Sequence, residues 1–446
     1  MRSGDCVAQK LSKKVQGIIA RDKKVFLTTT REPFPFVPHR GEGDFAYDID
    51  GRKFIDFTSF ISVYNLGVNS NSSVRNAIKK QIDLLMHSAF TDFYGEMPVR
   101  FGEELLKLMP RGFGKLFLSN SGTEANEAAI KFAKIYSNRS YILGFYNAFH
   151  GRTGGSLGVT ASKSIQREQF GPFPNDIHAP FPYCYRCPFN EKYPGCGFAC
   201  IDYIKKYPLS KEVSPKEVSA IMFEPIQGEG GYIVPPKDYF KELKKLADEN
   251  GMLMIADEVQ SGYMRTGKFL ALENFGITAD IYTMAKSVGA GLPIGVTAVS
   301  NALGDIPYGK HANTFGGNFA VTAGGYEALR QINSKKARLS EEVVQKGKYI
   351  MKRLERMKDD YEIIGDVRGI GLMIGVEFVK DKKGKEPNPE ARDAVQLKCF
   401  DKGLLLLPSG ESTIRIIPPL TVKKSTIDDG MGIFEDAVEE VSKRGA

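Results

Sequence analysis

Apolar runs and amphipathic helical patterns alternate through the middle of this chain, and the alternation limits the folds that it can adopt. The apolar runs cover residues 115–119, 140–145, 220–223, 253–256, 281–285 and 296–300. Helical patterns cover residues 124–135 and 237–250. Strands that alternate with helices form a parallel sheet covered on both faces. We therefore expect an α/β fold in which residues 61–330 build a large domain around a mostly parallel sheet.

The pattern changes near residue 331. We expect a long helix over 327–357, strands at 371–379, 404–407 and 414–417, and a final helix over 427–441. These elements predict a smaller α+β domain over 331–446, and we expect residues 1–60 to pack on it. A chain of 446 residues, 42% of them hydrophobic, can bury two cores of this kind.

The charge pattern is that of an ordinary enzyme. The net charge of +8 is spread along the chain, and its densest run, at 380–385, is typical of a solvated loop rather than a nucleic-acid-binding patch. The first 20 residues lack a continuous apolar core, so we expect neither a secretory signal nor a membrane span. The sequence favours a cytoplasmic enzyme without nucleic-acid or membrane partners.

A lysine, an aspartate and a small-residue turn suggest one cofactor. Lys286 follows the apolar run at 281–285, Asp257 ends the run at 253–256, and the turn before the first helix contains Ser121, Gly122 and Thr123. A lysine amine can attack an aldehyde, and an aspartate can keep a ring nitrogen protonated. Backbone N–H groups at a helix N-terminus bind phosphate. This set predicts pyridoxal 5′-phosphate and hence amino-acid chemistry.

The turn and the aspartate each have a structural alternative. The turn could be a simple helix cap, with Thr123 as the capping residue and Asn126 or Glu127 near the third helical position. Asp257 could belong to a structural ion pair, because a buried carboxylate needs a cationic or hydrogen-bonding partner. A pyridinium N–H would also supply that partner.

Phe149 stands between an expected strand and Gly151. An aromatic ring beside a glycine suits stacking on a flat cofactor that the backbone approaches closely. Packing of Phe149 in the core is the alternative, and His150 carries no signal of its own.

Four of the six cysteines cluster as Cys184-x-x-Cys187 and Cys196-x-x-x-Cys200. Such spacing could ligate zinc or an iron-sulfur centre. The second pair, however, is separated by three residues and no histidine lies inside the cluster, so two disulfides or four reduced thiols fit equally well. We expect no metal here and interpret the cluster as a local staple outside the catalytic site.

Longer motifs carry a family resemblance. The chain contains EPIQGEGG at 224–231, DEVQSGYMRTG at 257–267, GLPIG at 291–295, TFGGN at 314–318 and RIIPPL at 415–420. In this order and spacing, the motifs resemble class III aminotransferases of pyridoxal-phosphate fold type I. The resemblance is to the archaeal branch with 4-aminobutyrate and ornithine aminotransferases, which also includes amino-acid racemases. It implies a seven-stranded sheet and a homodimer with the active site at the interface.

The resemblance implies roles for matching positions. It places Ser121, Gly122, Thr123, Phe149, His150, Glu224, Asp257, Val259, Gln260, Lys286 and Thr314 at the cofactor. Gly122 and Thr123 would bind the phosphate, and Thr314 would reach the same phosphate from the partner subunit. Phe149 and Val259 would cover the two faces of the ring.

The resemblance also implies the catalytic residues. Asp257 would pair with the ring nitrogen, Gln260 would lie near the phenolic oxygen, and Lys286 would bind the cofactor and carry the substrate proton. Arg415 would hold a substrate carboxylate as a bidentate partner. Glu229 would pair with Arg415 and gate it, so that ω-amino and α-amino substrates are both accommodated.

Substrate choice is less constrained. Many members of the family have Gly-His-x-x-Pro where this chain has Gly-Val-Asn-Ser-Asn-Ser at 67–72. The segment at 91–94 resembles a substrate-side loop, where Asp92 could favour a basic substrate such as ornithine. A solvated loop is an equal alternative for Asp92.

Three functions follow from these residues. The chain could move the amino group of an ω-amino acid to 2-oxoglutarate, racemise an amino acid with the same cofactor, or bind ligands without catalysis. Retention of Lys286 and Asp257 argues against a silent binding protein. We favour transamination of a 4-aminobutyrate or ornithine type of substrate, with racemisation as the alternative.

Overall fold

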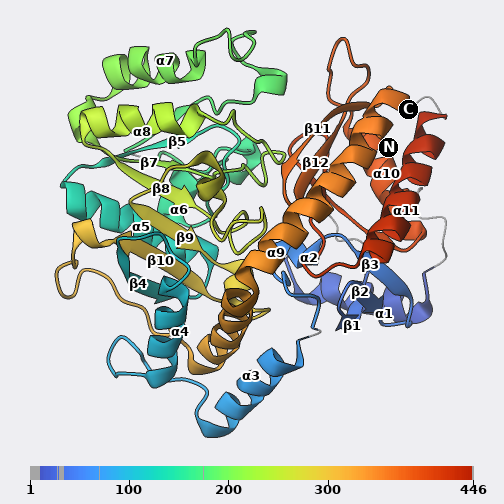
Figure 1. Ribbon diagram of the computed structural model, residues 1–446, viewed down its shortest axis with the longest axis horizontal. Coiled ribbons are helices and arrows are strands. Elements are labelled where there is room, and N and C mark those ends of the chain that lie inside the picture. The colour runs from blue at the N-terminus through green and yellow to red at the C-terminus, as the bar shows by residue number, and fades with distance from the viewer. Residues whose placement is uncertain (1–10, 28, 30–34, 70, 174, 444–446) are drawn as a thin grey trace.

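The computed structural model describes residues 11–27, 29, 35–69, 71–173 and 175–443 (Figure 1). Its largest sheet has the strand order β4 (Phe113–Ser119), β10 (Gly295–Ser300), β9 (Ile281–Met284), β8 (Leu253–Asp257), β7 (Val218–Phe223), β5 (Tyr141–Phe145) and β6 (Asp176–Ala179). Strand β10 is antiparallel to β4 and β9, and the other neighbouring pairs are parallel. The mostly parallel seven-stranded sheet predicted from the sequence is confirmed.

Helices cover both faces of this sheet. Helix α5 (Gly122–Ser137) packs its alanine-rich side on one face, against Ile142, Ala220 and Ile255. Helix α8 (Tyr239–Asn250) belongs to the core on the other face, with Phe145 and Phe223. Every residue of β7 and β9 is buried, as expected for parallel strands between two helical layers. The carboxyl ends of these strands therefore provide a rigid edge.

Helix α9 (Phe319–Asp360) links this sheet to the C-terminal part of the chain (Figure 1). That part contains an antiparallel sheet of β11 (Ile364–Ile370), β12 (Met373–Phe378), β15 (Thr413–Ile416) and β14 (Leu407–Ser409). Helices α10 (Pro389–Asp401) and α11 (Lys424–Ser442) accompany it. The smaller α+β unit is confirmed. Because α9 runs through residue 330 without a break, the division of the chain there stays a prediction.

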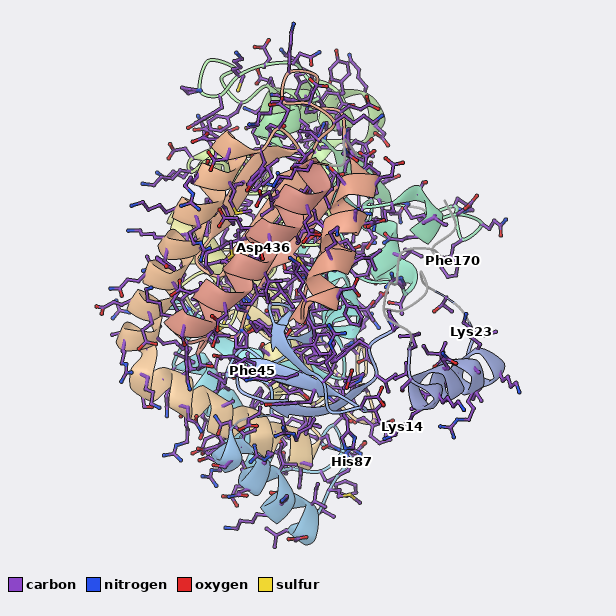
Figure 2. All side chains as sticks on the ribbon, turned by 90° about the vertical axis from the view of Figure 1, so that its right-hand side faces the viewer. Lys14, Lys23, Phe45, His87, Phe170 and Asp436 are labelled. Atoms are coloured by element: carbon purple, nitrogen blue, oxygen red, sulfur yellow. The ribbon has the colours of Figure 1, made fainter. Side chains whose placement is uncertain are left out.

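A third sheet joins the two ends of the chain. Its strand order is β1 (Pro38–Glu42), β2 (Phe45–Asp48), β3 (Lys53–Asp56) and β13 (Leu404–Leu405). Strand β13 pairs with β3 in parallel. The single strand expected over 404–407 is therefore wrong, because the chain leaves one sheet after Leu405 and enters another at Leu407. Figure 2 shows Phe45 on these strands. The figure also shows α1 (Lys13–Val25) at the edge of the molecule, where Lys14 donates to Ile49 O at 3.0 Å.

The remaining α-helices described are α3 (Ser72–Leu84), α4 (Glu96–Leu106), α6 (Gly154–Gly158) and α7 (Ala199–Lys206), and α2 (Ser59–Ser62) is a short turn whose residues all have positive φ. Among the helices described, none has the length and apolar content needed to cross a membrane.

Candidate active site

Lys286 lies two residues beyond the end of β9, at the start of a 3-10 turn over Lys286–Gly289. Its backbone has φ = +49°, a left-handed conformation that is uncommon for a residue with a side chain. No hydrogen bond or ion pair joins its amine to another described residue. Desolvation by the surrounding protein lowers the pKa of Lys286 from 10.5 to about 8, against the opposing effect of Asp257. The amine is therefore a far better nucleophile near neutral pH than an exposed lysine.

Asp257 ends β8, the strand next to β9, and is only 4% exposed. Its Oδ2 accepts from Asn126 Nδ2 at 2.8 Å and lies 2.8 Å from His150 Nδ1. Its Oδ1 accepts from Val259 N at 3.0 Å. A carboxylate oxygen can accept about two hydrogen bonds, so Oδ1 retains capacity for one more donor. A protonated ring nitrogen fits that requirement.

Asn126 and His150 hold this carboxylate in place. Asn126 also donates to His150 O at 2.6 Å and accepts from Thr283 Oγ1 at 2.6 Å. His150 is buried, and its Nε2 has no partner among the described residues. Asn126 is thus part of the polar network at Asp257 rather than a residue of a helix cap.

The turn before α5 has the geometry of a helix N-terminus. Ser121, and not Thr123, is the capping residue, because Ser121 Oγ accepts from Glu124 N at 3.3 Å. The alternative of a simple cap with Thr123 as the capping residue is therefore wrong in register. Thr123 Oγ1 lies 2.6 Å from Ser156 Oγ. The N–H groups of Gly122 and Thr123 belong to the first turn of a 16-residue helix, where an anion is favoured.

Gly122 also lies against Val259. A Cβ on Gly122 would approach Val259 Cγ1 to 2.9 Å, closer than side chains normally pack. Phe149 is half-buried and does not belong to the hydrophobic core, so the structure does not support core packing of this ring. Val259, one of the two positions expected to cover a flat ring, therefore lies beside the turn that precedes α5.

Glu224 is buried in the same region, and Gln260 is half-buried next to Val259. Glu224 accepts from Phe149 N at 2.9 Å and from Gly228 N at 2.8 Å, and burial raises its pKa to about 7. Gln260 Oε1 accepts from Tyr232 OH at 2.7 Å. Glu224 therefore fixes the backbone at Phe149 and Gly228, and Tyr232 orients the Gln260 amide.

Arg415 on β15 is 6% exposed and lies beside Glu229. Its Nη2 is 3.5 Å from Glu229 Oε2, and its Nε is buried without a partner among the described residues. The opposite oxygen, Glu229 Oε1, accepts from Lys163 Nζ at 3.0 Å. Glu229 therefore lies between two cations, and Lys163 is a residue that sequence reasoning missed.

Thr314 and Asp92 are placed differently. Both are exposed, and among the contacts of the described residues none joins either of them to Lys286 or Arg415. Their loops are neighbours, because Thr91 Oγ1 donates to Asn313 O at 3.0 Å. Within one chain these two residues lie outside the group that surrounds Lys286.

A buried arginine supports the site from behind, and it too was missed. Arg265 is fully buried and donates to Ser62 Oγ at 3.2 Å, to Leu372 O at 3.3 Å, and to Asn65 Oδ1 and Pro418 O. Burial lowers the pKa of Arg265 to about 10, which leaves it charged at neutral pH. Its partners come from both ends of the chain, so Arg265 links segments that the sequence places far apart.

The four clustered cysteines lie away from these residues. They line one small cavity, between Phe181 and Pro236. All four are free thiols, so the two-disulfide alternative is wrong. In the part of the chain that the structure describes, no group of three or more potential ligands is arranged to hold a metal ion.

Known proteins match almost the whole chain. The family model described as aminotransferase class-III covers residues 26–438. A leucine/methionine racemase of Thermococcus litoralis is 38% identical over 96% of each chain. An acetylornithine aminotransferase of Clostridium acetobutylicum is 37% identical over 93% of this chain and 100% of its own. A probable 4-aminobutyrate aminotransferase of Bacillus subtilis is 34% identical over 89% of this chain and 91% of its own.

A solved structure agrees with the fold. An amine transaminase from an uncultivated Pseudomonas species, in its pyridoxal-phosphate-bound form, superposes with a TM-score of 0.86 at 26% identity. The match covers 95% of this chain and 99% of the other.

Proposed function

The chain belongs to the class III aminotransferases, and from that premise we propose that it moves the amino group of an ω-amino acid to 2-oxoglutarate. Its substrates are then amino acids and 2-oxo acids. The single observation that carries this choice is the position of Glu229 between Arg415 and Lys163. A transaminase must accept two different substrates in one pocket, and a carboxylate that can leave its arginine allows this.

Pyridoxal 5′-phosphate is the cofactor of this enzyme, and it supplies an electron sink for the bond that breaks at the substrate carbon. In the proposed arrangement Lys286 binds its aldehyde and Asp257 its ring nitrogen. The first-turn N–H groups of Gly122 and Thr123 hold its phosphate, with Ser121 beside them. Phe149, Val259, Gln260, His150 and Glu224 complete the surroundings of the ring.

Lys286 is proposed as the proton carrier. An amine with a pKa of about 8 is neutral often enough at physiological pH to accept a proton from the substrate carbon, and it can return that proton efficiently. Arg415 lowers the pKa of Lys286 further, whereas Asp257 opposes that effect. The charge balance around the amine therefore depends on the same residues that bind substrate and cofactor.

Asp257 is proposed to keep the ring nitrogen protonated. Its carboxylate is held by Asn126 and by the backbone N–H of Val259, and His150 lies against the same oxygen as Asn126. A fixed carboxylate beside a ring nitrogen favours the protonated ring. This position does not require Asp257 to move during the reaction.

The two substrates make opposite demands on Arg415. The α-carboxylate of 2-oxoglutarate needs a cation, which Arg415 provides after Glu229 leaves it. An ω-amino donor presents its amine at the end of the chain and favours an arginine masked by Glu229. We call the Glu229–Arg415 ion pair the gate.

Separate half-reactions test this proposal. Glu229→Ala should shift donor preference from ω-amino towards α-amino acids, and Arg415→Ala should slow the half-reaction with 2-oxoglutarate most. Arg338→Ala removes an exposed arginine and should leave both half-reactions unchanged. Rapid inversion of an amino acid without a keto acid, with negligible glutamate formed across a panel of donors, would contradict the transaminase.

That outcome would instead favour racemisation. The Thermococcus litoralis relative, at 38% identity, supports this second candidate. A racemase needs acid-base groups on both faces of the substrate carbon, with Lys286 on one and Glu229 proposed on the other. Glu229→Ala would then abolish inversion rather than alter donor preference.

The site is proposed to be completed in a homodimer. Thr314 is exposed in the single chain, and we propose that it reaches the phosphate of the partner's cofactor. Asp92 is exposed on the neighbouring loop and is proposed to favour a basic donor such as ornithine. Light scattering that shows a monomer at micromolar concentration would contradict this arrangement.

A further inference from the structure

Lys163 contacts the gate from the side opposite Arg415. Its Nζ is 3.0 Å from Glu229 Oε1, while Arg415 Nη2 is 3.5 Å from Glu229 Oε2. Arg415 is nearly buried, but the Lys163 side chain is 45% exposed. Glu229 thus bridges one buried cation, whose charge lowers the pKa of Lys286, and one partly exposed cation.

A cavity of about 290 Å³ lies on the Lys163 side of the gate. Lys163, Gly230 and Gly410 contribute to its wall. The backbone of Glu229 is fixed there, because its carbonyl accepts from Gly410 N at 2.7 Å. The next residue, Gly230, lies close against a neighbouring backbone segment, since a Cβ there would be 2.4 Å from Asn147 O. A change of partner by Glu229 therefore involves its side chain, and the neighbouring Lys163 borders the cavity.

We propose that Lys163 is the positioning residue that holds Glu229 when a substrate carboxylate occupies Arg415. The inference rests on the proposed function of the gate. A carboxylate that leaves Arg415 without another cation would lose its charge partner, which would oppose opening. Lys163 already contacts Oε1 of Glu229. It can also bind Oε2 after that oxygen leaves Arg415, without any movement of the backbone. It therefore lowers the cost of opening the gate for α-carboxylates.

The effect of removing Lys163 has a definite sign. Without it, Arg415 is the sole cation of Glu229 among the described contacts, so the closed gate becomes harder to open. An α-carboxylate then binds less tightly. A partly exposed ion pair contributes little, and the corresponding change in affinity is about two- to fivefold.

Glutarate tests this without turnover, because it carries two carboxylates and no keto group. Its Kd is measured by calorimetry on the holoenzyme, for wild type, Lys163→Met, Lys163→Arg, Glu229→Gln and the double variant Lys163→Met/Glu229→Gln. We expect Lys163→Met to raise Kd about two- to fivefold and Lys163→Arg to restore it. In the Glu229→Gln background, Lys163→Met should leave the Kd of glutarate unchanged, because residue 229 no longer has a carboxylate for Lys163 to bind.

Lys241 offers a matched control, because it forms a 2.9 Å ion pair with Asp238 at similar exposure, away from the gate. Lys241→Met should leave Kd unchanged. An equal effect of Lys163→Met with and without Glu229 would mean that Lys163 contacts the ligand directly, and would overturn the inference. So would an unchanged Kd, or failure of glutarate to bind wild type. Failure of the proposed function is seen separately, as absence of glutamate formation by the wild-type enzyme.

Discussion

The lowered pKa of Lys286 makes a quantitative prediction about how the apoenzyme captures its cofactor. The experiment varies the pH and follows the amine of Lys286, which is expected to attack the cofactor aldehyde. With a pKa of about 8, the neutral fraction at pH 7 is ~10%, compared with ~0.03% for a lysine at its ordinary value of 10.5. Lys286 should therefore react ~300-fold faster at pH 7 than an equally accessible free amine.

Stopped-flow absorbance measures this rate. Apoenzyme is mixed with excess pyridoxal phosphate from pH 6 to 10.5, and Nα-acetyl-lysine is measured in parallel to remove the ionisation of the cofactor itself. After division by the rate of Nα-acetyl-lysine per neutral amine, the rate of Lys286 should rise about tenfold per pH unit below 8 and become level above it. Lys286→Ala should bind cofactor without covalent capture and lose turnover by several orders of magnitude.

Two variants test the cause of the shift. Arg415 lowers the pKa of Lys286, so Arg415→Met should move the midpoint to higher pH. Asp257 raises it, so Asp257→Asn should move the midpoint to lower pH. A wild-type midpoint near 10.5 would refute desolvation at Lys286. Shifts of both variants in the same direction would refute the electrostatic account.

The parts of the fold found from the sequence are those whose signal is local. Strands β7, β8 and β9 are short apolar runs buried between helices, and their composition alone distinguishes them from loops. Strands β6 and β11 were missed. Each combines charged or small residues with apolar ones, and β11 contains two glycines, which weaken the strand signal.

The candidate site could be predicted from the sequence to the extent that its chemistry depends on residue type. A lysine, a strand-end aspartate and a phosphate turn form a recognisable set, and the structure brings Lys286 and Asp257 to the ends of adjacent strands. Lys163 could not be found in this way, because it lies 66 residues from Glu229 and exposed lysines are common. Buried Arg265 was missed for the same reason, since its partners are defined only by tertiary contacts.

The turn at residues 59–62 has a backbone conformation that could not be predicted from the sequence. Four consecutive residues without glycine, Ser59 to Ser62, all have positive φ between 44° and 64°. Phe and Ile disfavour this conformation, so no sequence rule predicts it. The strain persists because Arg265 and neighbouring groups hold the turn. Ser62 O in turn accepts from Ser287 Oγ, next to Lys286, so this turn contributes to placing Lys286.

Three further substitutions test the supports of the site. Serine at all four clustered cysteines should lower the free energy of unfolding by about 1–3 kcal/mol and leave the cofactor spectrum intact, since Cys200 is buried; stoichiometric zinc or iron in the wild type would contradict the metal-free cluster. Asp257→Asn should slow turnover about 100-fold or more, because a neutral amide cannot keep the ring nitrogen protonated, yet change the melting temperature of the holoenzyme little. A variant that unfolds would show that Asp257 is structural. Arg265→Met should lower the free energy of unfolding by about 3–5 kcal/mol, because it leaves several buried acceptors without a donor. Arg338→Met, at an exposed ion pair, should change it by less than about 1 kcal/mol. Denaturant titration compares the two arginines, and equal losses would mean that the buried hydrogen bonds of Arg265 do not stabilise the strained turn.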